Sequence, residues 1–103
     1  MENNINPQHI HLTVVFTGKK GSSAQLETLI KEAVIASRKE EACLQYDLHR
    51  DTADQDIFIL HETWADQPGL DLHNTMPYLK SFITEAADLL EVPLKIYRTD
   101  FIL

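Results

Sequence analysis

His73 is the residue of this chain best placed to move a proton. It sits on a short segment that Asp66 can cap, between the strand ending at Trp64 and a helix start near Thr75. It therefore lies in a connection between regular elements, where functional side chains are often found. Histidine changes charge near neutral pH, because the unperturbed pKa of an imidazole is about 6.5. The position is consistent with a general acid or base. A structural role for His73, packing against the next helix or capping it, explains the position equally well.

Aromatic side chains could form the walls of a pocket for a flat ligand. Tyr46, Trp64 and Tyr78 each combine an apolar ring with a polar tip that can hydrogen-bond to a ligand. Trp64 stands at a strand end, where either a core or a pocket role fits. Phe82 belongs to a regular helical stripe, which favours the core.

Glu62 is predicted on the same strand face as Trp64. A carboxylate that points toward a covered sheet face needs a partner such as Arg50, Arg98 or a backbone amide. A structural ion pair is the simpler role for Glu62, and contact with a substrate is the alternative.

The other histidines do not form a recognisable metal site. His9 and His11 share one face of the first strand, but no cysteine or carboxylate at ligand spacing accompanies them. His49 and His61 fall on neighbouring strands, which is typical of a sheet surface or an interface. We therefore expect no metal.

The sequence contains no motif for cysteine nucleophilic catalysis and none for binding a nucleotide cofactor. Cys43 has no histidine-containing nucleophile motif around it, so it is interpreted as a small apolar residue. Gly18 and Gly21 belong to neither a phosphate-binding loop nor a dinucleotide fingerprint. We expect neither nucleophilic catalysis nor a tightly held nucleotide cofactor.

Hydrophobic periodicity predicts the elements that position these residues. Alternation predicts strands over residues 9–16, 43–50, 57–64 and 94–102. A capping box at Ser22 and Gln25 begins the first predicted helix, which ends near residues 38–41. A short helical turn follows Asp66, and the second helix starts at residues 75–77. Its apolar stripe comprises Leu79, Phe82, Ile83, Ala86, Leu89 and Leu90.

The resulting order is βαββαβ, the ferredoxin-like plan of an α+β domain with helices on one face of an antiparallel sheet. The 103 residues suffice for one core, so we expect a single domain over residues 1–103, with residues 1–8 as a flexible segment. Apolar residues on the other sheet face must also be buried. A second copy of the chain would bury Val15, Ile57 or Ile59 there, so we expect a homodimer.

Composition argues against two classes of partner. The formal net charge is −7 and the pI is near 5.0, which repels a phosphate backbone and an anionic membrane. No apolar run approaches the roughly 20 residues of a membrane-spanning helix. The single cysteine cannot form an internal disulfide, and the polar N-terminal residues lack an export signal. We expect a cytoplasmic protein that binds neither nucleic acid nor membranes.

Three stretches, residues 36–46, 58–64 and 73–78, resemble the antibiotic biosynthesis monooxygenase family in order and spacing. The most specific part is Glu62-x-Trp64 followed by His73. Glu40 matches the usual glutamate of the family, whereas Glu41-Ala42 replaces the Pro-Gly that commonly follows it. The resemblance implies a dimeric α+β barrel of ferredoxin-like protomers, each with a pocket between sheet and helices.

The resemblance also implies candidate functions. Members include cofactor-independent oxygenases of quinols and polyketide phenols, haem-degrading enzymes, and an isomerase of a phosphorylated signalling sugar. Trp64 and His73 match pocket-lining positions, and Tyr46 matches an aromatic position on the second strand. Haem degraders use an asparagine on the first strand, and the nearest inward candidate here is Thr13, which argues against haem.

We therefore expect a cofactor-independent monooxygenase that oxidises a quinol or phenol-like molecule with O₂. A deprotonated, electron-rich phenol can itself reduce O₂, so the protein need only bind, deprotonate and shield it. His73 would be the base, and Tyr46, Glu62, Trp64 and Tyr78 would hold the substrate. Two alternatives stay open. One is a proton-transfer isomerase whose anion ligands would come from Arg38, Arg50, Lys80 and Arg98, and the other is a non-catalytic dimer that binds a small molecule.

Overall fold

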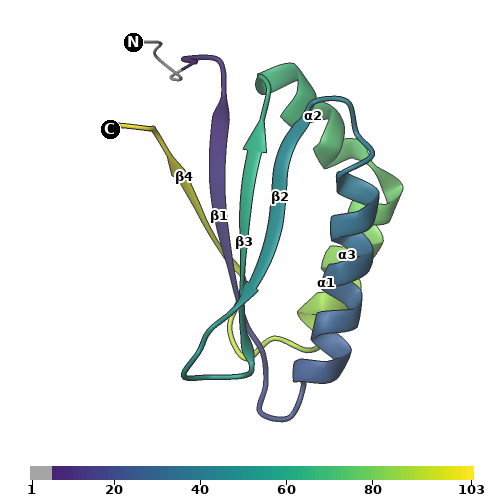
Figure 1. Ribbon diagram of the computed structural model, residues 1–103. Coiled ribbons are helices and arrows are strands. Elements are labelled where there is room, and N and C mark those ends of the chain that lie inside the picture. The colour runs from purple at the N-terminus through teal and green to yellow at the C-terminus, as the bar shows by residue number, and fades with distance from the viewer. Residues whose placement is uncertain (1–5) are drawn as a thin grey trace.

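The computed structural model describes residues 6–103, which form a four-stranded antiparallel sheet with helices on one face (Figure 1). The predicted ferredoxin-like α+β architecture is confirmed. Of the predicted flexible segment, residues 1–5 lie outside the described part of the chain. The elements are β1 (Ile10–Thr17), α1 (Ser23–Ser37), β2 (Cys43–Arg50), β3 (Ile57–Trp64), α2 (Gln67–Thr75), α3 (Pro77–Ala87) and β4 (Lys95–Thr99).

The strand order is β2-β3-β1-β4, so the first and third strands form the centre of the sheet. β2 and β3 pair as an antiparallel hairpin, with Leu48 opposite Leu60, so the predicted placement of these two strands as neighbours is confirmed. On β1, Val14 pairs with Leu60 on one side and with Ile96 on the other. Because side chains alternate along a strand, these paired residues point toward the same face. Val14 and Leu60 are buried, which identifies this face as the one beneath the helices.

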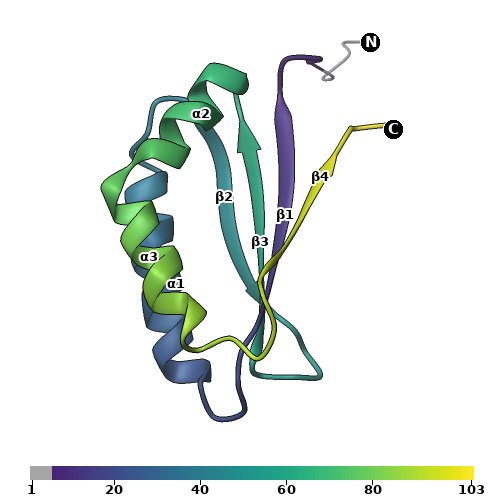
Figure 2. The ribbon, with the colours of Figure 1, turned by 180° about the vertical axis from the view of Figure 1, so that it is seen from behind.

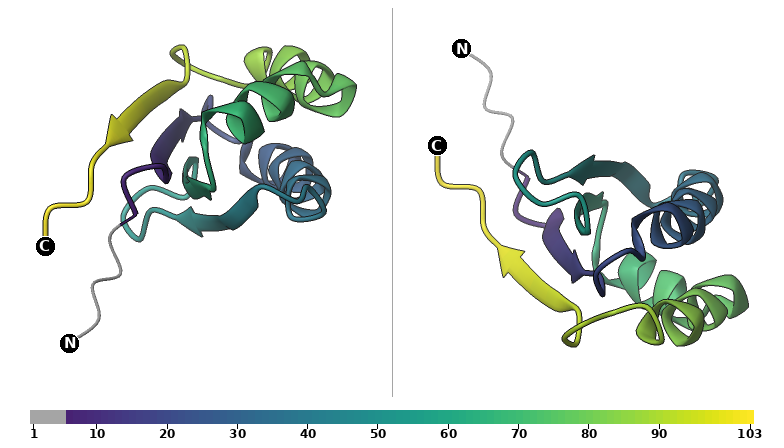
Figure 3. Two further views of the ribbon diagram at one scale, coloured as in Figure 1. Left: turned by 90° about the horizontal axis from the view of Figure 1, so that it is seen from above. Right: turned by 90° about the horizontal axis from the view of Figure 1, so that it is seen from below.

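The helices form a second layer over the sheet, seen end-on in Figure 3. On α1, Leu26 and Ile30 have no exposed surface. Of the stripe predicted for the second helix, Leu79, Phe82 and Ala86 are buried on α3, whereas Ile83 is 44% exposed. Leu89 and Leu90 lie beyond the end of α3, where Leu89 is half-buried and Leu90 is buried. The largest fully buried side chains are Trp64, Phe16, Phe58, Leu26, Ile30 and Leu60.

The start of α1 differs from its prediction. Ser22 adopts helical backbone angles, φ −86° and ψ −6°, and its side chain makes no capping hydrogen bond. A capping serine normally has extended backbone, which aims its oxygen at the free amides of the first turn. Ser22 Oγ is instead buried without a partner, in a turn where an added Cβ on Gly18 would lie 2.4 Å from it. The predicted capping box is therefore wrong.

The two shorter helices are separated by one extended residue. Asp66 has the extended backbone of a capping residue and accepts a hydrogen bond from Gly69 N at 2.8 Å, as predicted. Met76, between α2 and α3, is also extended because the residue before a proline avoids the helical region. Pro77 then begins α3. This break lets α2 cross the end of the sheet before α3 returns along it (Figure 2).

The sheet face opposite the helices carries Val15, Ile57 and Ile59, each half-buried. His49 and His61 also lie side by side on neighbouring strands, with ring centroids 5.2 Å apart. The last strand is shorter than residues 94–102, and all five residues of β4 are exposed. Among residues 6–103 it is an edge strand that pairs only with β1, and that ladder ends at Thr99. Within residues 6–103, no helix is both long and apolar enough to span a membrane.

Candidate functional site

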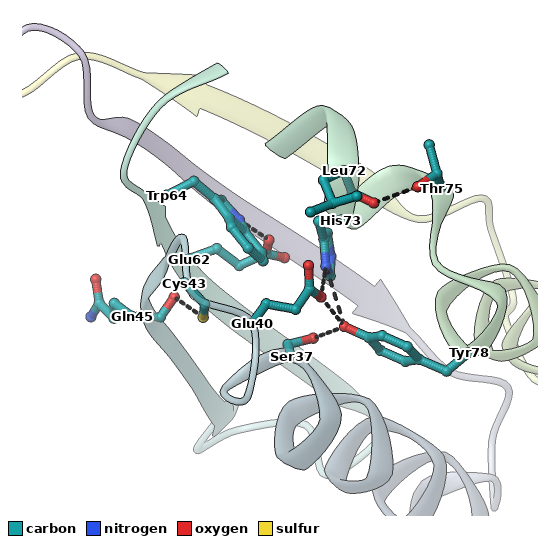
Figure 4. A network of polar contacts seen from close by, with 10 residues as sticks. All are labelled: Ser37, Glu40, Cys43, Gln45, Glu62, Trp64, Leu72, His73, Thr75 and Tyr78. Carbon is teal, nitrogen blue, oxygen red and sulfur yellow. Dashed lines mark hydrogen bonds and ion pairs between the residues drawn. The ribbon is translucent and has the colours of Figure 1, made fainter. Parts of the chain in front are cut away.

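His73 lies in α2 and is only 3% exposed. Its Nδ1 is 2.7 Å from Oε2 of Glu40, in the connection between α1 and β2 (Figure 4). A carboxylate can only accept, so Nδ1 carries the proton of this hydrogen bond. In neutral imidazole the other nitrogen is then an acceptor. Among the described residues, Nε2 of His73 has no hydrogen-bond partner, which leaves it available to a ligand.

Two hydroxyl groups complete the surroundings of Glu40. The hydroxyl of Tyr78 donates to Glu40 Oε2, and Ser37 Oγ lies 2.9 Å from the same hydroxyl. Burial, followed by the hydrogen bond to Glu40, raises the pKa of Tyr78 above its ordinary value, so the phenol stays protonated and donates. Glu40 is fixed by two donors, and it in turn fixes the orientation of His73.

Two aromatic rings hold the other sides of the imidazole. The Trp64 ring is tilted by 36° over His73 with centroids 4.3 Å apart, and Tyr46 meets the imidazole edge-on at 5.9 Å. Trp64 is completely buried, and it lies behind His73 rather than in the wall of the cavity described next. Burial raises the pKa of Tyr46, so its phenol also stays protonated.

A cavity of about 80 Å³ lies between the sheet and the helices. Tyr46, Glu62, His73 and Asn74 form its polar end, and apolar side chains form the rest of its wall. By the volume that one buried water needs, this space accommodates on the order of six non-hydrogen atoms, about one aromatic ring. Of the five predicted site residues, the structure brings three, Tyr46, Glu62 and His73, to this cavity. Trp64 and Tyr78 contact His73 from outside it.

Glu62 has a different partner from those predicted. Its Oε1 accepts a hydrogen bond from Trp64 Nε1 at 3.0 Å, whereas Arg50 pairs with Glu27 and Arg98 donates to Gln67. The prediction of an arginine or backbone partner is therefore wrong, because both guanidinium groups lie at the exposed surface. Burial raises the pKa of Glu62, opposed by the Trp64 hydrogen bond. Relative to an exposed carboxyl group, the fold shifts Glu62 toward its neutral form, which is the form that can donate a hydrogen bond.

Glu62→Gln should therefore raise the melting temperature at neutral pH. The pKa of Glu62 lies above its ordinary value of 4.5 in the folded protein, so the native state binds more protons than the unfolded state between the two pKa values. Stability of the natural protein then falls as pH rises through that window, and glutamine does not titrate. Thermal unfolding from pH 4 to pH 8 should show the advantage of Glu62→Gln growing with pH. Glu85→Gln, on the exposed surface of α3, is the matched control, and an advantage independent of pH would contradict the assignment.

Cys43 is next to the site but is not activated. Burial, together with the carboxylates of Glu62 and Glu40, raises the pKa of its thiol to about 11. A rise from 9.0 to about 11 lowers the thiolate fraction roughly 100-fold at neutral pH. We expect iodoacetamide to modify Cys43 far more slowly in the folded protein than in urea, measured by intact mass at pH 8. Equal rates in the two states would contradict this.

The described residues lack a grouped set of metal ligands, and they overturn the reason given above against haem. In residues 6–103, no three His, Cys, Asp or Glu side chains are grouped so that they could hold a metal ion. Thr13 was expected to point inward, but it pairs with His61 and Tyr97 between the cavity-lining Leu12 and Val14. Alternation places Thr13 on the opposite sheet face, so that prediction is wrong.

Glu40 is the residue that sequence reasoning did not place in the site. It is 33 residues from His73 in the chain, and only the packing of the α1–β2 connection against α2 brings them together. Its match to a family glutamate was the one signal available, and that signal gave it no role. Ser37, which ends α1 and is fully buried, carried no signal.

Comparison with known proteins identifies the family. The family model described as "Antibiotic biosynthesis monooxygenase" matches residues 9–85. Two curated relatives are similar over 64 residues: "Putative monooxygenase YcnE" of Bacillus subtilis (strain 168), 33% identical, and "Uncharacterized protein sll1783" of Synechocystis sp., 34% identical. These alignments cover 62% and 60% of this chain, 67% of the first relative and 44% of the second.

Solved structures share the fold of this chain. PA3566 from Pseudomonas aeruginosa superimposes with a TM-score of 0.87 at 29% identity, covering 98% of this chain and 100% of that one. A structure described as "Putative antibiotic biosynthesis monooxygenase from Nitrosomonas europaea" has a TM-score of 0.88 at 14% identity and covers 97% and 96%, which supports the fold alone. The match of one family model to three-quarters of the sequence is decisive: this chain belongs to the antibiotic biosynthesis monooxygenase family.

Proposed function

We propose that this protein is a cofactor-independent monooxygenase that oxidises a quinol or phenol with O₂. One observation carries the proposal. His73 is held by Glu40 through Nδ1, and it lines a mainly apolar cavity with Nε2 unpaired. A fixed acceptor nitrogen beside an apolar, ring-sized space suits the removal of a proton from a phenolic hydroxyl.

In the proposed reaction, Nε2 of His73 takes the proton of the substrate hydroxyl. The carboxylate of Glu40 stabilises the imidazolium that forms, as a charge-assisted hydrogen bond does. The electron-rich phenolate then reduces O₂. One oxygen atom enters the ring and the other leaves as water, so that a phenol becomes a quinone and a quinol becomes a hydroxyquinone. A placed base contributes roughly 10²- to 10⁴-fold to such a step.

Two further groups at the polar end of the cavity would hold the substrate. Glu62 in its neutral form can donate a hydrogen bond to a second ring oxygen, and Tyr46 closes the wall beside it. Trp64 and Tyr78 act through His73, which they contact from outside the cavity. The apolar remainder of the wall excludes water from the reactive phenolate.

The proposal includes a homodimer in the cytoplasm. Val15, Ile57 and Ile59 are apolar residues on a sheet face that no helix covers (Figure 1). A second copy of the chain packed sheet against sheet would remove them from water. Sedimentation of the purified protein tests this association, and a monomer at micromolar concentration would overturn it.

The experiment for the reaction is oxygen consumption by metal-free protein with a panel of quinols and polyphenols. We expect uptake with at least one compound, with one O₂ consumed per product, and its loss in His73→Ala. Uptake that survives in His73→Ala would remove His73 from the mechanism. Binding without uptake across the panel would favour a binding protein or an isomerase.

The isomerase alternative has weaker support in the geometry. Arg38 donates hydrogen bonds to the Tyr46 carbonyl and to Asp47, and Arg50 forms an ion pair with Glu27. Neither they nor Lys80 and Arg98 line the cavity within the described residues. A phosphorylated substrate would therefore meet no cation beside His73, whereas an uncharged phenol needs none.

Glu40→Gln should lower kcat about tenfold and leave KM nearly unchanged. An amide can still accept from Nδ1 of His73, but it lacks the charge that stabilises the imidazolium, and charge-assisted hydrogen bonds are roughly twice as strong as neutral ones. Steady-state kinetics with a substrate from the panel measures the effect. Tyr78→Phe removes a donor to the same oxygen and is the matched control. A change confined to KM would contradict a positioning role for Glu40.

A further inference from the structure

The cavity beside His73 has a polar end and an apolar end. Tyr46, Glu62, His73 and Asn74 lie where β3 finishes, whereas Phe16 lies at the other end of the wall. Leu12 and Phe16 both line the cavity on β1 and are four residues apart, about 14 Å along a strand. A bound molecule therefore meets polar groups at one end only.

The apolar end of the cavity adjoins a groove on the surface. This second hollow, which we call the tail groove, has a volume of about 390 Å³. It runs past the last turn of α3 and the connection to β4, and its lining includes Ala87, Leu90, Val92 and Pro93. Ile83 and Leu94 line both the cavity and the tail groove, so these two side chains stand at the boundary between the two spaces.

The register of the sheet also places the tail groove next to the apolar end of the cavity. Lys95 pairs with Val15, so Leu94 comes opposite Phe16, at the apolar end of the cavity. Ile83 is 44% exposed and Val92 is 49% exposed, although both are large apolar side chains. Exposed apolar residues that adjoin a pocket are typical of a surface that a ligand covers.

The charge of the tail groove limits which kinds of ligand chain can bind in it. The tail groove contains one charged residue, the carboxylate-bearing Glu91, and no cation lines it within the described residues. An anionic tail such as a fatty acid would be repelled, while a neutral hydrocarbon chain would not. The cavity itself holds about one ring.

From this geometry we infer that the substrate is a single-ring quinol or phenol with a neutral alkyl or prenyl chain, the ring beside His73 and the chain in the tail groove. The inference rests on the proposed oxygenase activity for its reactive head group. It specifies that the substrate carries a hydrocarbon chain, because a ring without a chain would leave the tail groove empty. Each methylene that enters the groove should tighten binding about fourfold, since burying one CH₂ stabilises by about 0.8 kcal/mol.

The test uses hydroquinones that differ only in one alkyl chain, from methyl to decyl. Binding is measured under argon, where no turnover occurs, through the fluorescence of the single tryptophan, which contacts His73. We expect Kd to fall with chain length and then level off when the tail groove is full. Val92→Ser should weaken that dependence, whereas Ile35→Ser, a matched change at a 59% exposed residue of α1, should leave it unchanged.

Each outcome separates this inference from the proposed reaction. A Kd independent of chain length, or no binding at any length, overturns the tail groove even if oxygen uptake occurs in air. Chain-dependent binding without oxygen uptake supports the groove and overturns the oxygenase. A Val92→Ser variant that changes the oligomeric state but not the chain dependence would assign the groove to a second copy of the chain, and the inference would fail.

Discussion

Trp64→Ala is expected to destabilise the protein by about 3–5 kcal/mol, the usual cost of emptying a large aromatic site in a core. Trp64 is completely buried, it packs edge-to-face with Tyr46 at 6.2 Å, and its ring lies over His73. Its loss also leaves Glu62 without its indole donor. Because this is the only tryptophan, urea unfolding must be followed by circular dichroism rather than fluorescence.

Trp64→Phe separates packing from the hydrogen bond. Phenylalanine keeps most of the apolar volume but cannot donate to Glu62, so it should cost less, about 1–3 kcal/mol, the penalty for an unsatisfied buried polar group. Ile35→Ala, at an exposed position of α1, is the control and should change stability by no more than about 0.5 kcal/mol. A Trp64→Ala variant as stable as this control would mean that the ring is not part of the core.

The central strands could be predicted from the sequence because their pattern and their environment agree. Residues 57–64 alternate between buried and half-buried positions, and the predicted bounds of β3 are the observed ones. The apolar run at residues 94–102 misled the prediction. Periodicity records which residues are apolar but not whether a neighbouring strand is present, and in the described part of the chain no strand pairs with the residues beyond Thr99.

The same distinction holds at the site. His73 and Glu62 were recognisable because they are ionisable side chains beside a strand end and a cap, which are local features. The contact between Glu40 and His73 is not local, and neither is the contact of Ser37 with Tyr78. The resemblance put Trp64 with His73 among the pocket-lining positions, whereas the packing places Trp64 behind the imidazole and outside the cavity wall.

Gly69 illustrates how a tertiary contact can reverse a local rule. It lies inside α2, where alanine is normally favoured over glycine by about 1 kcal/mol. A Cβ at this position would lie 2.3 Å from the Cβ of Ala42 and 3.0 Å from Asp66 Oδ1. Neither Cβ can move without its backbone, so α2 and the α1–β2 connection would have to separate.

We expect the steric effect to exceed the helical preference, with Gly69→Ala destabilising the protein by about 1–3 kcal/mol, as overpacking does. The paired change Ala42→Gly removes the obstructing atom and leaves the new Cβ at 3.7 Å from the Ala42 Cα, an ordinary contact. The double variant should therefore be more stable than Gly69→Ala alone, and a double-mutant cycle by urea unfolding measures that coupling. Additive effects would mean that the two segments do not touch. Ala42 lies in the connection that carries Glu40, and Gly69 precedes His73 by about one helical turn. We therefore expect a separation of these two segments to move the Glu40 carboxylate away from the His73 imidazole. Activity should then recover together with stability in the double variant.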